Sequence, residues 1–257
     1  MNFLEYAVIK ISIITAVYNN REHLEECFSS VFAQTYPNIE FIVVDGGSTD
    51  GSVEIIQQYA QKIARWVSEP DKGIYDALNK GIGMATGDVV GFLHSEDLFY
   101  SSATIEHIAK AFEETTCEAV FGNLMYVSRD NPDRIIRYWK SNPFKARLLK
   151  QGWMPPHPTL FVKRQWYANK GTFRTDFRIS ADYDLILRLF SDKKFTTEYL
   201  PEVITKMRAG GASNRSLGNI YTKSREDYIA LRQSGVGGTW TLFMKNIRKV
   251  WQFVRKD

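Results

Sequence analysis

The sequence predicts an α/β fold: a mostly parallel central sheet with helices on both faces, followed by C-terminal helices. Short β-branched runs alternate with segments of helical periodicity through the first half of the chain, and strands separated by helices of about 10 to 15 residues are typical of βαβ units. The 257 residues, 44% of them hydrophobic and 24% charged, suffice for a sizeable core. This composition excludes an intrinsically disordered chain, a fibrous repeat and a coiled coil.

The first half of the chain supplies the predicted parallel strands. The runs KISIITAV and IEFIVV are rich in β-branched residues, and a polar loop follows each of them. A helical apolar stripe begins after Asn19 and Asn20, residue types that often cap helices. We expect strands at 10–17, 39–44, 65–67 and 88–93, and helices that start near 20, at 52 and at 73, the last ending at 85.

The second half of the chain is less regular. Three prolines surround His157 and predict a stiff loop there. Glycines at 235, 237 and 238 separate two helical stretches at the C-terminus. We expect helices at 101–112 and 182–190, and strands at 119–127, 134–139, 195–197 and 203–208.

The net charge of +4 is unevenly distributed along the chain. Residues 1–204 carry 22 basic and 26 acidic side chains, a net charge of −4, whereas residues 205–257 carry 11 basic and 3 acidic ones, a net charge of +8. The mild basicity of the chain is therefore a property of its last fifth.

Cysteines and apolar segments indicate the compartment. Cys27 and Cys117 lie 90 positions apart without a metal-ligand spacing, so we expect buried, reduced thiols and neither a disulfide framework nor a zinc site. The N-terminal residues 1–8 include Glu5 and lack the apolar run of a secretory signal. No window reaches the roughly 18 to 20 apolar residues of a membrane span. We expect a cytoplasmic protein.

Four polar loops follow predicted strands, at 15–20, 45–51, 69–73 and 94–97. Ligands of open α/β sheets bind beyond the carboxyl ends of the strands. Acidic residues occur in three of these loops. The fold itself does not need acids at these strand ends, where their mutual repulsion costs free energy. Carboxylates that converge at one sheet edge suit a divalent cation that binds together with phosphates. The Gly-rich loops of dinucleotide-binding proteins and P-loop NTPases are absent from the sequence.

Four ordered segments carry a resemblance to a known family: ISIITAVYN, FIVVDGGSTDGS, SEPDKGIYDALNKGIGMATGDVVGFLHSEDLF and ISADYDLILRL. In order and spacing they resemble the inverting family 2 glycosyltransferases of the GT-A fold, over about residues 10–208. The resemblance implies transfer of a sugar from a nucleotide diphosphate donor, most often UDP-linked, to an acceptor hydroxyl in cell-surface polysaccharide assembly. It also implies a catalytic domain over 1–208, with a donor half at about 10–115, an acceptor half at about 116–208 and a helical extension over 209–257.

The same resemblance implies roles for individual residues. A divalent cation, Mn²⁺ or Mg²⁺, would be held by Asp97, with Glu96 as the weaker second ligand. The general base would be Asp182, with Asp184 as its nearest rival, and His157 would contact the acceptor. The residues implied in nucleotide-sugar binding are Thr15, Val17, Asn19, Asp45, Asp71, Lys72, His94 and Glu96.

Some of these positions have a second interpretation or depart from the family pattern. Asp182 is also a suitable helix N-cap, and His157 is also interpretable as a solvent-facing loop imidazole. Relatives usually carry Asp or Asn at position 94 and Asp at position 96, where this chain has His94 and Glu96. The longer Glu96 side chain could move between direct and water-mediated contact with a metal.

Residues 240–257 predict an amphipathic basic helix. Phe243, Ile247, Val250, Trp251 and Val254 share one face, and Lys245, Arg248, Lys249, Arg255 and Lys256 share the other. A cationic face opposite Trp and Phe is typical of helices that lie in an anionic membrane interface. Peripheral attachment to the inner face of the cell membrane is therefore one expectation, and a helix docked on the domain is the other.

The sequence leaves two further interpretations of function. One is a nucleotide-sugar-binding scaffold with a decayed catalytic site, motivated by His94 and Glu96. The other is a nucleotidyl- or phosphosugar transferase, although the loop TAVYNN is a poor phosphate loop. The expected partners are a nucleotide sugar donor and a saccharide or lipid-linked saccharide acceptor. Nucleic acid is not an expected partner because no recognition motif is present, and the oligomeric state stays open.

Overall fold

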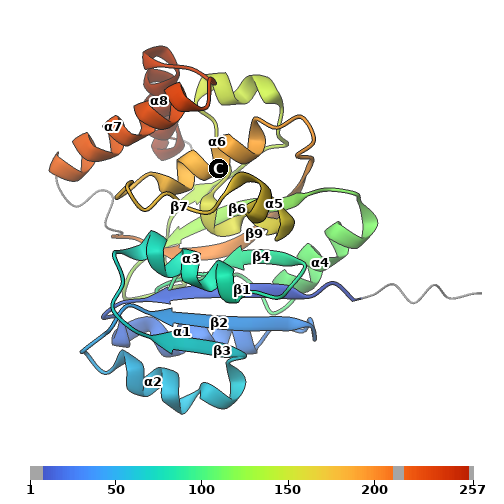
Figure 1. Ribbon diagram of the computed structural model, residues 1–257, viewed down its shortest axis with the longest axis vertical. Helices are drawn as coiled ribbons and strands as arrows, with labels where there is room; N and C mark the ends of the chain where they lie inside the picture. The colour runs from blue at the N-terminus through green and yellow to red at the C-terminus, as the bar shows by residue number, and fades with distance from the viewer. Residues whose placement is uncertain (1–7, 211–216, 255–257) are drawn as a thin grey trace, which may run out of the picture.

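The computed structural model describes residues 8–210 and 217–254, with side chains in the last segment from 218 to 247. Its centre is a nine-stranded sheet in the order β3-β2-β1-β4-β8-β6-β9-β5, and β7 pairs with β6 outside this path. Helices cover both faces of the sheet (Figure 1). The longest ladders are parallel, which confirms the predicted α/β class.

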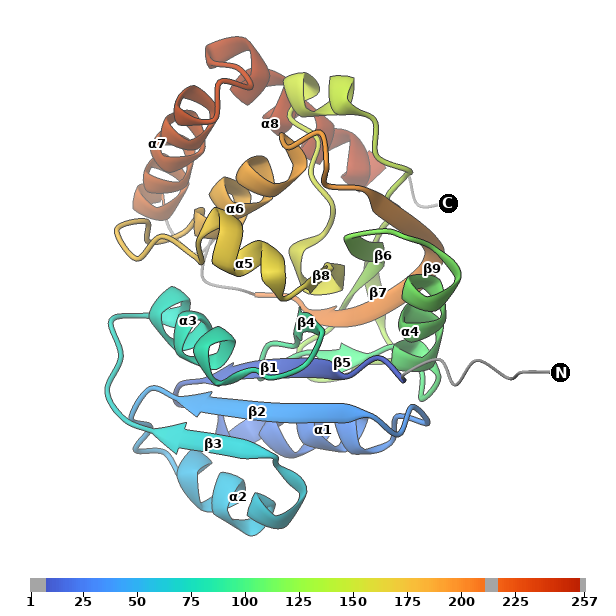
Figure 2. The same cartoon turned by 45° about the vertical axis from the view of Figure 1, so that its right-hand side comes forward.

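The first half of the sheet consists of four parallel strands, β3, β2, β1 and β4. Their bounds are Ile11–Val17 (β1), Ile39–Asp45 (β2), Arg65–Ser68 (β3) and Val89–Phe92 (β4). In Figure 2, α3 lies on one face of this layer and α1 and α2 lie on the other. Because the strands are parallel, their carboxyl ends and the polar loops that follow them meet at one edge, as the sequence predicts.

The second half of the sheet is mixed. The long strand β6 (Ala119–Val127) runs parallel to β9 (Thr197–Arg208) and antiparallel to β7 (Ile135–Trp139) and β8 (Phe161–Lys163). The two-residue strand β5 (Leu98–Phe99) closes the edge against β9. The helices are α1 (Arg21–Phe32), α2 (Ser52–Gln58), α3 (Ile74–Met84), α4 (Thr104–Glu114), α5 (Gln165–Lys170), α6 (Ala181–Phe190), α7 (Leu217–Gln233) and α8 (Thr239–Val254).

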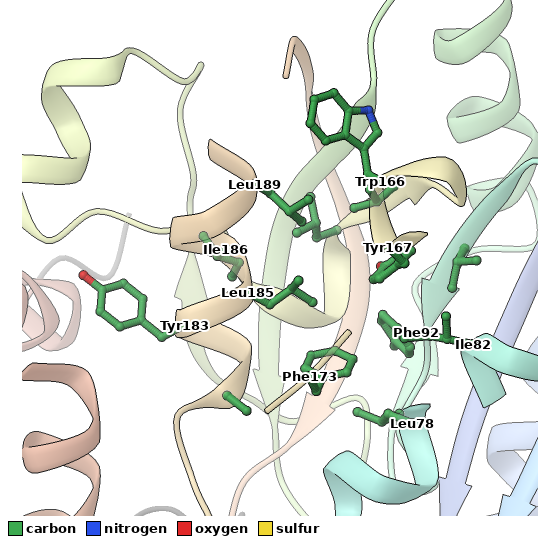
Figure 3. Close-up of a cluster of buried hydrophobic side chains, with 14 of the residues drawn as sticks. Leu78, Ile82, Phe92, Trp166, Tyr167, Phe173, Tyr183, Leu185, Ile186 and Leu189 are labelled. Carbon is green, nitrogen blue, oxygen red and sulfur yellow. The ribbon is translucent and has the colours of Figure 1, made fainter. Parts of the chain in front are cut away.

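Alternating side chains of the buried strands supply two hydrophobic cores. Ile13 and Val43 face α1 and α2, whereas Ile14 and Ile42 face α3 and the second half of the molecule. In the second core, Leu185 and Leu189 of α6 lie on the side of Phe92 and α3, while Tyr183 points the other way, toward the C-terminal helices (Figure 3). This division leaves Tyr183 free for the functional site described below.

The structure corrects several predicted elements. The two strands expected at 195–197 and 203–208 are one strand, β9, with register shifts opposite β6. The short elements β5, β8 and α5 carry no sequence signal, because two to six residues are too few to show a period. Asn20 stands at the N-cap of α1, but its amide Nδ2 donates to Ser95 Oγ at 3.0 Å and makes no cap hydrogen bond.

The C-terminal helices pack on the second half of the molecule, α7 against α6 and α8 against β7. Glu226 of α7 accepts hydrogen bonds from the backbone amides of Arg178, Ile179 and Ser180, which precede α6. These three bonds tie α7 to the start of α6. Among the helices that the structure describes, none has both the length and the apolar character needed to cross a membrane.

Candidate active site

The loops after β1 and β2 are locked together by Asn19 and Asp45. Asn19 adopts a left-handed φ of 47°, its backbone amide donates to Ser48 Oγ at 2.8 Å, and its Oδ1 accepts from the Thr49 amide at 2.9 Å. The fully buried Asp45 carboxylate accepts from the amides of Gly47 and Ser48 and from two serine hydroxyls. Both residues thus shape the loops to which the family resemblance assigns nucleotide-sugar binding.

Other residues implied in nucleotide binding lie at different depths. The side chains of Thr15 and Val17 are buried, and the Thr15 hydroxyl donates to the Leu93 carbonyl at 2.8 Å. Both residues belong to the end of β1, so the loop predicted to start at 15 starts after Val17, and its backbone is what remains for a nucleotide contact. Asp71 accepts from the Gly73 amide at 2.8 Å, and Lys72 is exposed.

Close packing brings Asp71 to the loop after β2. A Cβ at Gly46 would lie 2.4 Å from Asp71 Oδ2, so the missing side chain of Gly46 leaves room for that carboxylate beside the loop. The structure thus brings Asn19, Asp45 and Asp71 together at the carboxyl edge of the parallel strands.

Asp97 is a buried carboxylate with one unpartnered oxygen. Its side chain is 2% exposed, and Oδ1 accepts from the Arg208 amide at 3.2 Å. Its Oδ2 has no hydrogen-bond partner among the described residues. Burial raises the pKa of Asp97 to about 8, and the neighbouring Glu96 adds to the rise. Buried polar atoms nearly always have partners, so this oxygen is a natural position for a ligand.

Glu96 turns away from Asp97 toward a partner that the sequence did not indicate. Its Oε2 accepts from Arg129 Nη1 at 2.7 Å, and both side chains are about one third exposed. Arg208 fixes the loop at 94–97. It donates to the carbonyls of Glu96 and Arg129 and forms an ion pair with Glu26. Arg129 and Arg208 were not predicted, because nothing in their local sequence links them to residues about 30 and 110 positions away.

His94 and His157 lie together beneath the site. Their ring centroids are 5.9 Å apart, and His157 stacks on Phe92 at 5.5 Å. His157 is 9% exposed, so the interpretation as a solvent-facing imidazole is wrong. Burial lowers the pKa of each histidine to about 4, and the two rings are therefore neutral at pH 7. Neutral imidazoles can donate to and accept from hydroxyl groups.

Asp182 lies in the first turn of α6, half-buried at a cavity wall. Its Oδ1 accepts from the Tyr183 amide at 2.8 Å and lies 3.5 Å from the Tyr75 hydroxyl. Burial raises the pKa of Asp182, and the ammonium group of Lys245 opposes that rise. A carboxylate whose pKa is raised is a better proton acceptor, which is the property that a general base needs.

Asp184, the rival of Asp182, has a structural role in the fold. It is buried, pairs with Arg188 at 2.8 Å and lies 3.9 Å from Arg174. Arg188 in turn donates to the carbonyls of the segment that follows α5. Residues two positions apart in a helix point in different directions. Of Asp182 and Asp184, only Asp182 therefore lines the cavity.

A cavity of about 590 Å³ joins Asp182, His94, His157 and Arg208. Residues that sequence reasoning did not assign to a site form much of its wall. These include Tyr126, Arg137, Trp139, Trp153, Tyr183, Lys223, Asp227 and Lys245. A second hollow of about 790 Å³ borders the locked loops and includes Asn19, Asn20, Gly51 and Arg129.

The C-terminal helix α8 contributes to the first cavity. Lys245, expected on the solvated face of an amphipathic helix, points inward, where its ammonium lies 2.8 Å from Asp227 Oδ2 and 3.2 Å from the centre of the Tyr183 ring. Phe243 and Trp240, by contrast, are exposed. The docked-helix interpretation therefore describes the first half of α8; Arg248, Lys249, Arg255 and Lys256 lie outside the residues whose side chains are described.

The residues present fit a divalent cation that arrives with a diphosphate. Within the described part of the chain, no group of three or more His, Cys, Asp or Glu residues could hold a metal alone. Mg²⁺, however, is usually bound through one or two carboxylates together with substrate phosphates. Asp97 offers one such oxygen, while Glu96 is engaged by Arg129.

Comparison with known proteins adds an independent line of evidence. A family model described as glycosyl transferase family 2 matches residues 12–173. A glycosyltransferase of Mycobacterium tuberculosis, described as uncharacterized, is 36% identical over 180 residues, covering 69% of this chain and 68% of the relative. The PGL/p-HBAD biosynthesis glycosyltransferase of the same species is 28% identical over 217 residues, covering 82% of each chain.

Solved structures agree in fold. The complex of S. aureus TarS 1–349 with UDP-GlcNAc has a TM-score of 0.69 at 17% identity, over 89% of this chain and 66% of that chain, just under two thirds of its length. The mannosyltransferase PcManGT of Pyrobaculum calidifontis, in complex with GDP-Man and Mn²⁺, has a TM-score of 0.66 at 19% identity, over 96% and 72%. With a family model matched over more than half of its length and a relative 36% identical over 69% of it, the chain belongs to glycosyltransferase family 2 and is a glycosyltransferase of the GT-A fold.

Proposed function

We propose that the protein is a metal-dependent, inverting glycosyltransferase of cell-surface polysaccharide or glycoconjugate assembly. It would move a sugar from a nucleotide diphosphate donor, UDP-linked by preference, to an acceptor hydroxyl. The observation that carries the proposal is the presence of two carboxylates in different surroundings. Asp97 keeps a buried oxygen that has no partner among the described residues, and Asp182 opens onto the cavity beside His94 and His157.

The donor would bind at the edge formed by the loops after β1, β2 and β3. The chain's own groups there are the backbone of 15–20, the Asn19–Asp45 network and the Asp71–Lys72 turn. A nucleotide and Mn²⁺ are bound by proteins of the same fold. Asp97 would hold the divalent cation, with Glu96 either joining it or staying with Arg129. When bound, the cation would neutralise the charge that develops on the leaving diphosphate.

The acceptor would bind in the cavity that Asp182 lines. An acceptor hydroxyl is a weak nucleophile at neutral pH, so a carboxylate must take its proton as it attacks the anomeric carbon. Asp182 would be that base, and the neutral His157 would orient the hydroxyl. One base and one displacement invert the anomeric configuration, so an α-linked donor would yield a β-linked product.

A thermal-shift panel of nucleoside diphosphates and nucleotide sugars tests the donor side. The binding nucleotide sugar at about 100 times its Kd should stabilise the native chain by about 2.7 kcal/mol, which raises Tm by about 5 to 10 °C at this chain length. The shift should require Mn²⁺ or Mg²⁺ and should fall in the presence of EDTA. A chain that binds a nucleotide sugar but neither hydrolyses nor transfers it would support the decayed scaffold instead.

We also propose that the exposed start of α8 touches an anionic membrane surface. Trp240 and Phe243 are 68% and 53% exposed, and their ring centroids are 5.7 Å apart. Burial of an aromatic side chain contributes about 1.5–3 kcal/mol. In co-sedimentation with phosphatidylserine-containing vesicles, the Trp240→Ser/Phe243→Ser double variant should bind at least about tenfold more weakly than the wild type.

The matched control for this experiment is Tyr100→Ser, which removes an exposed aromatic ring from the residue that follows β5. Its vesicle binding should equal that of the wild type. Point variants are preferable to deletion of 239–257, because deletion would also remove Lys245 from the cavity wall. Equal sedimentation of the double variant and the wild type would disprove membrane contact through these rings.

A further inference from the structure

The end of the acceptor cavity that α7 and α8 form carries two ammonium groups on one carboxylate. Asp227 Oδ2 accepts from Lys223 at 2.6 Å and from Lys245 at 2.8 Å. Asp227 is 1% exposed, and the side chain of Lys245 is 11% exposed. A single carboxylate balances only one of the two positive charges, and little solvent is present to screen the other.

The rest of the described cavity wall does not supply the missing negative charge. Lys140 and Arg208 also line the cavity, and Asp182 is the only further carboxylate among its described lining residues. Arg208 is balanced by Glu26, which lies outside that lining. The cavity wall therefore carries an excess of positive charge although the acid that we assign as the base belongs to it.

The position of Lys245 is set by tight packing, so its ammonium group is held at a fixed place in the cavity wall. Gly152 has a left-handed φ of 71°, and a Cβ there would lie 2.5 Å from Lys245 Cβ and 2.6 Å from its Cα. Only a residue without a side chain allows α8 to approach the segment 146–151 this closely. The close approach holds Lys245 over Tyr183, which α6 turns toward it.

Burial makes Lys245 responsive to a nearby anion. Burial lowers the pKa of Lys245 to about 7, against the attraction of Asp227. Although burial opposes it, the charges of Lys245 and Lys223 hold the pKa of Asp227 below its usual range. The charged groups that face Lys245 are therefore Asp227 and Lys223 of α7 and Asp182 of α6. A further negative charge would favour the protonated form of Lys245.

We propose that this end of the cavity binds an anionic group of the acceptor, a phosphate or a carboxylate, through Lys223 and Lys245. The proposal rests on the proposed function for the identity of the occupant as the glycosyl acceptor. Trp139 of the same cavity, which is only partly buried, offers an apolar ring for the rest of that molecule. The two C-terminal helices, which lie beyond the matched residues 12–173, thus select the acceptor by charge.

Isothermal titration calorimetry with the full chain tests this proposal. The probes are inorganic phosphate, D-glucuronate and neutral D-glucose, each added in the presence of a saturating nucleoside diphosphate so that the donor site is filled. At least one anion should bind while glucose does not. Binding of phosphate points to a phosphate-linked acceptor, and binding of glucuronate points to an acidic sugar.

Variants locate the binding. Lys245→Met and Lys223→Met should each weaken the anion by about 10- to 100-fold, the loss expected for one charge-assisted hydrogen bond, whereas Lys245→Arg should retain binding. Lys150→Met is the matched control, since Lys150 is an exposed lysine on the neighbouring segment outside the cavity lining. It should bind as the wild type does.

The pH dependence gives a readout that a purely structural lysine would not move. Because the anion raises the pKa of Lys245 from about 7, binding of glucuronate should take up protons between pH 7 and 8, and its affinity should fall as pH rises through that range. Absence of binding for both anions, equal binding of glucose, or equal loss in Lys150→Met would overturn the proposal. Intact nucleoside diphosphate binding in the same samples would confine that failure to the anion site.

Discussion

Replacement of Asp182 by asparagine is expected to lower kcat for sugar transfer by about 10²- to 10⁴-fold, the usual contribution of a positioned acid or base. The amide keeps the size of the side chain and can still accept from the Tyr183 amide, but it cannot take a proton from the acceptor hydroxyl. Donor affinity should stay unchanged, because Asp182 lies on the acceptor side. Steady-state transfer rates, or donor hydrolysis with water as the acceptor, provide the measurement.

The control for this variant lies two residues away in the same helix. Asp184→Asn weakens the pairing with Arg188 and should lower the stability of the fold. Its kcat per folded molecule should nevertheless remain close to that of the wild type. Retention of more than about one tenth of kcat in Asp182→Asn would show that another group accepts the proton.

Replacement of Asp97 by asparagine should remove the metal dependence of donor binding and lower transfer by at least about 100-fold, since a bound cation stabilises the transition state by several kcal/mol. The amide can still accept from the Arg208 amide. It also removes a buried carboxylate whose Oδ2 has no partner among the described residues. The free energy of unfolding without metal should therefore not fall. Titration of Mn²⁺ in the presence of donor provides the measurement.

A comparison with Glu96→Gln separates the two acidic residues of this loop. The structure pairs Glu96 with Arg129 at 2.7 Å, so its replacement should have a smaller effect on metal affinity than the replacement of Asp97. An equal loss in the two variants would show that Glu96 leaves Arg129 and ligates the metal when the donor binds. Unchanged Mn²⁺ dependence in Asp97→Asn would refute its role as a metal ligand.

The donor half of the fold was predictable from sequence because its signals are local. Each of the runs at 11–17, 39–45 and 89–92 is buried on both faces, and a polar loop follows directly. In the acceptor half the signals are weaker. β8 pairs with β4 and β6, which lie tens of residues away, and its three residues have no period of their own. Pairing with these distant strands, and not a local pattern, defines such a strand.

The candidate site divides in the same way. Asp97 and Asp182 stand in motifs of consecutive residues, so the roles proposed for them followed from the resemblance, and the structure adds the burial of Asp97 and the cavity beside Asp182. Arg129, Asp227 and Lys245 could not be assigned, because each meets the site only through packing between distant elements. Lys245 shows the limit of helical periodicity most clearly: the pattern separates polar from apolar faces, but it cannot tell which face meets a cavity.

The uneven charge followed from the sequence alone, as did the βαβ order and the family motifs, because composition, periodicity and consecutive residues are local properties of the chain. Tertiary structure alone decided where that charge acts. One part of the positive excess of residues 205–257 lies inside the molecule, on Lys223, Lys245 and the buried Arg208. The physical reason is packing: α8 can approach the segment after β7 because Gly152 has no side chain, and that approach turns Lys245 from solvent into the cavity that Asp182 also lines.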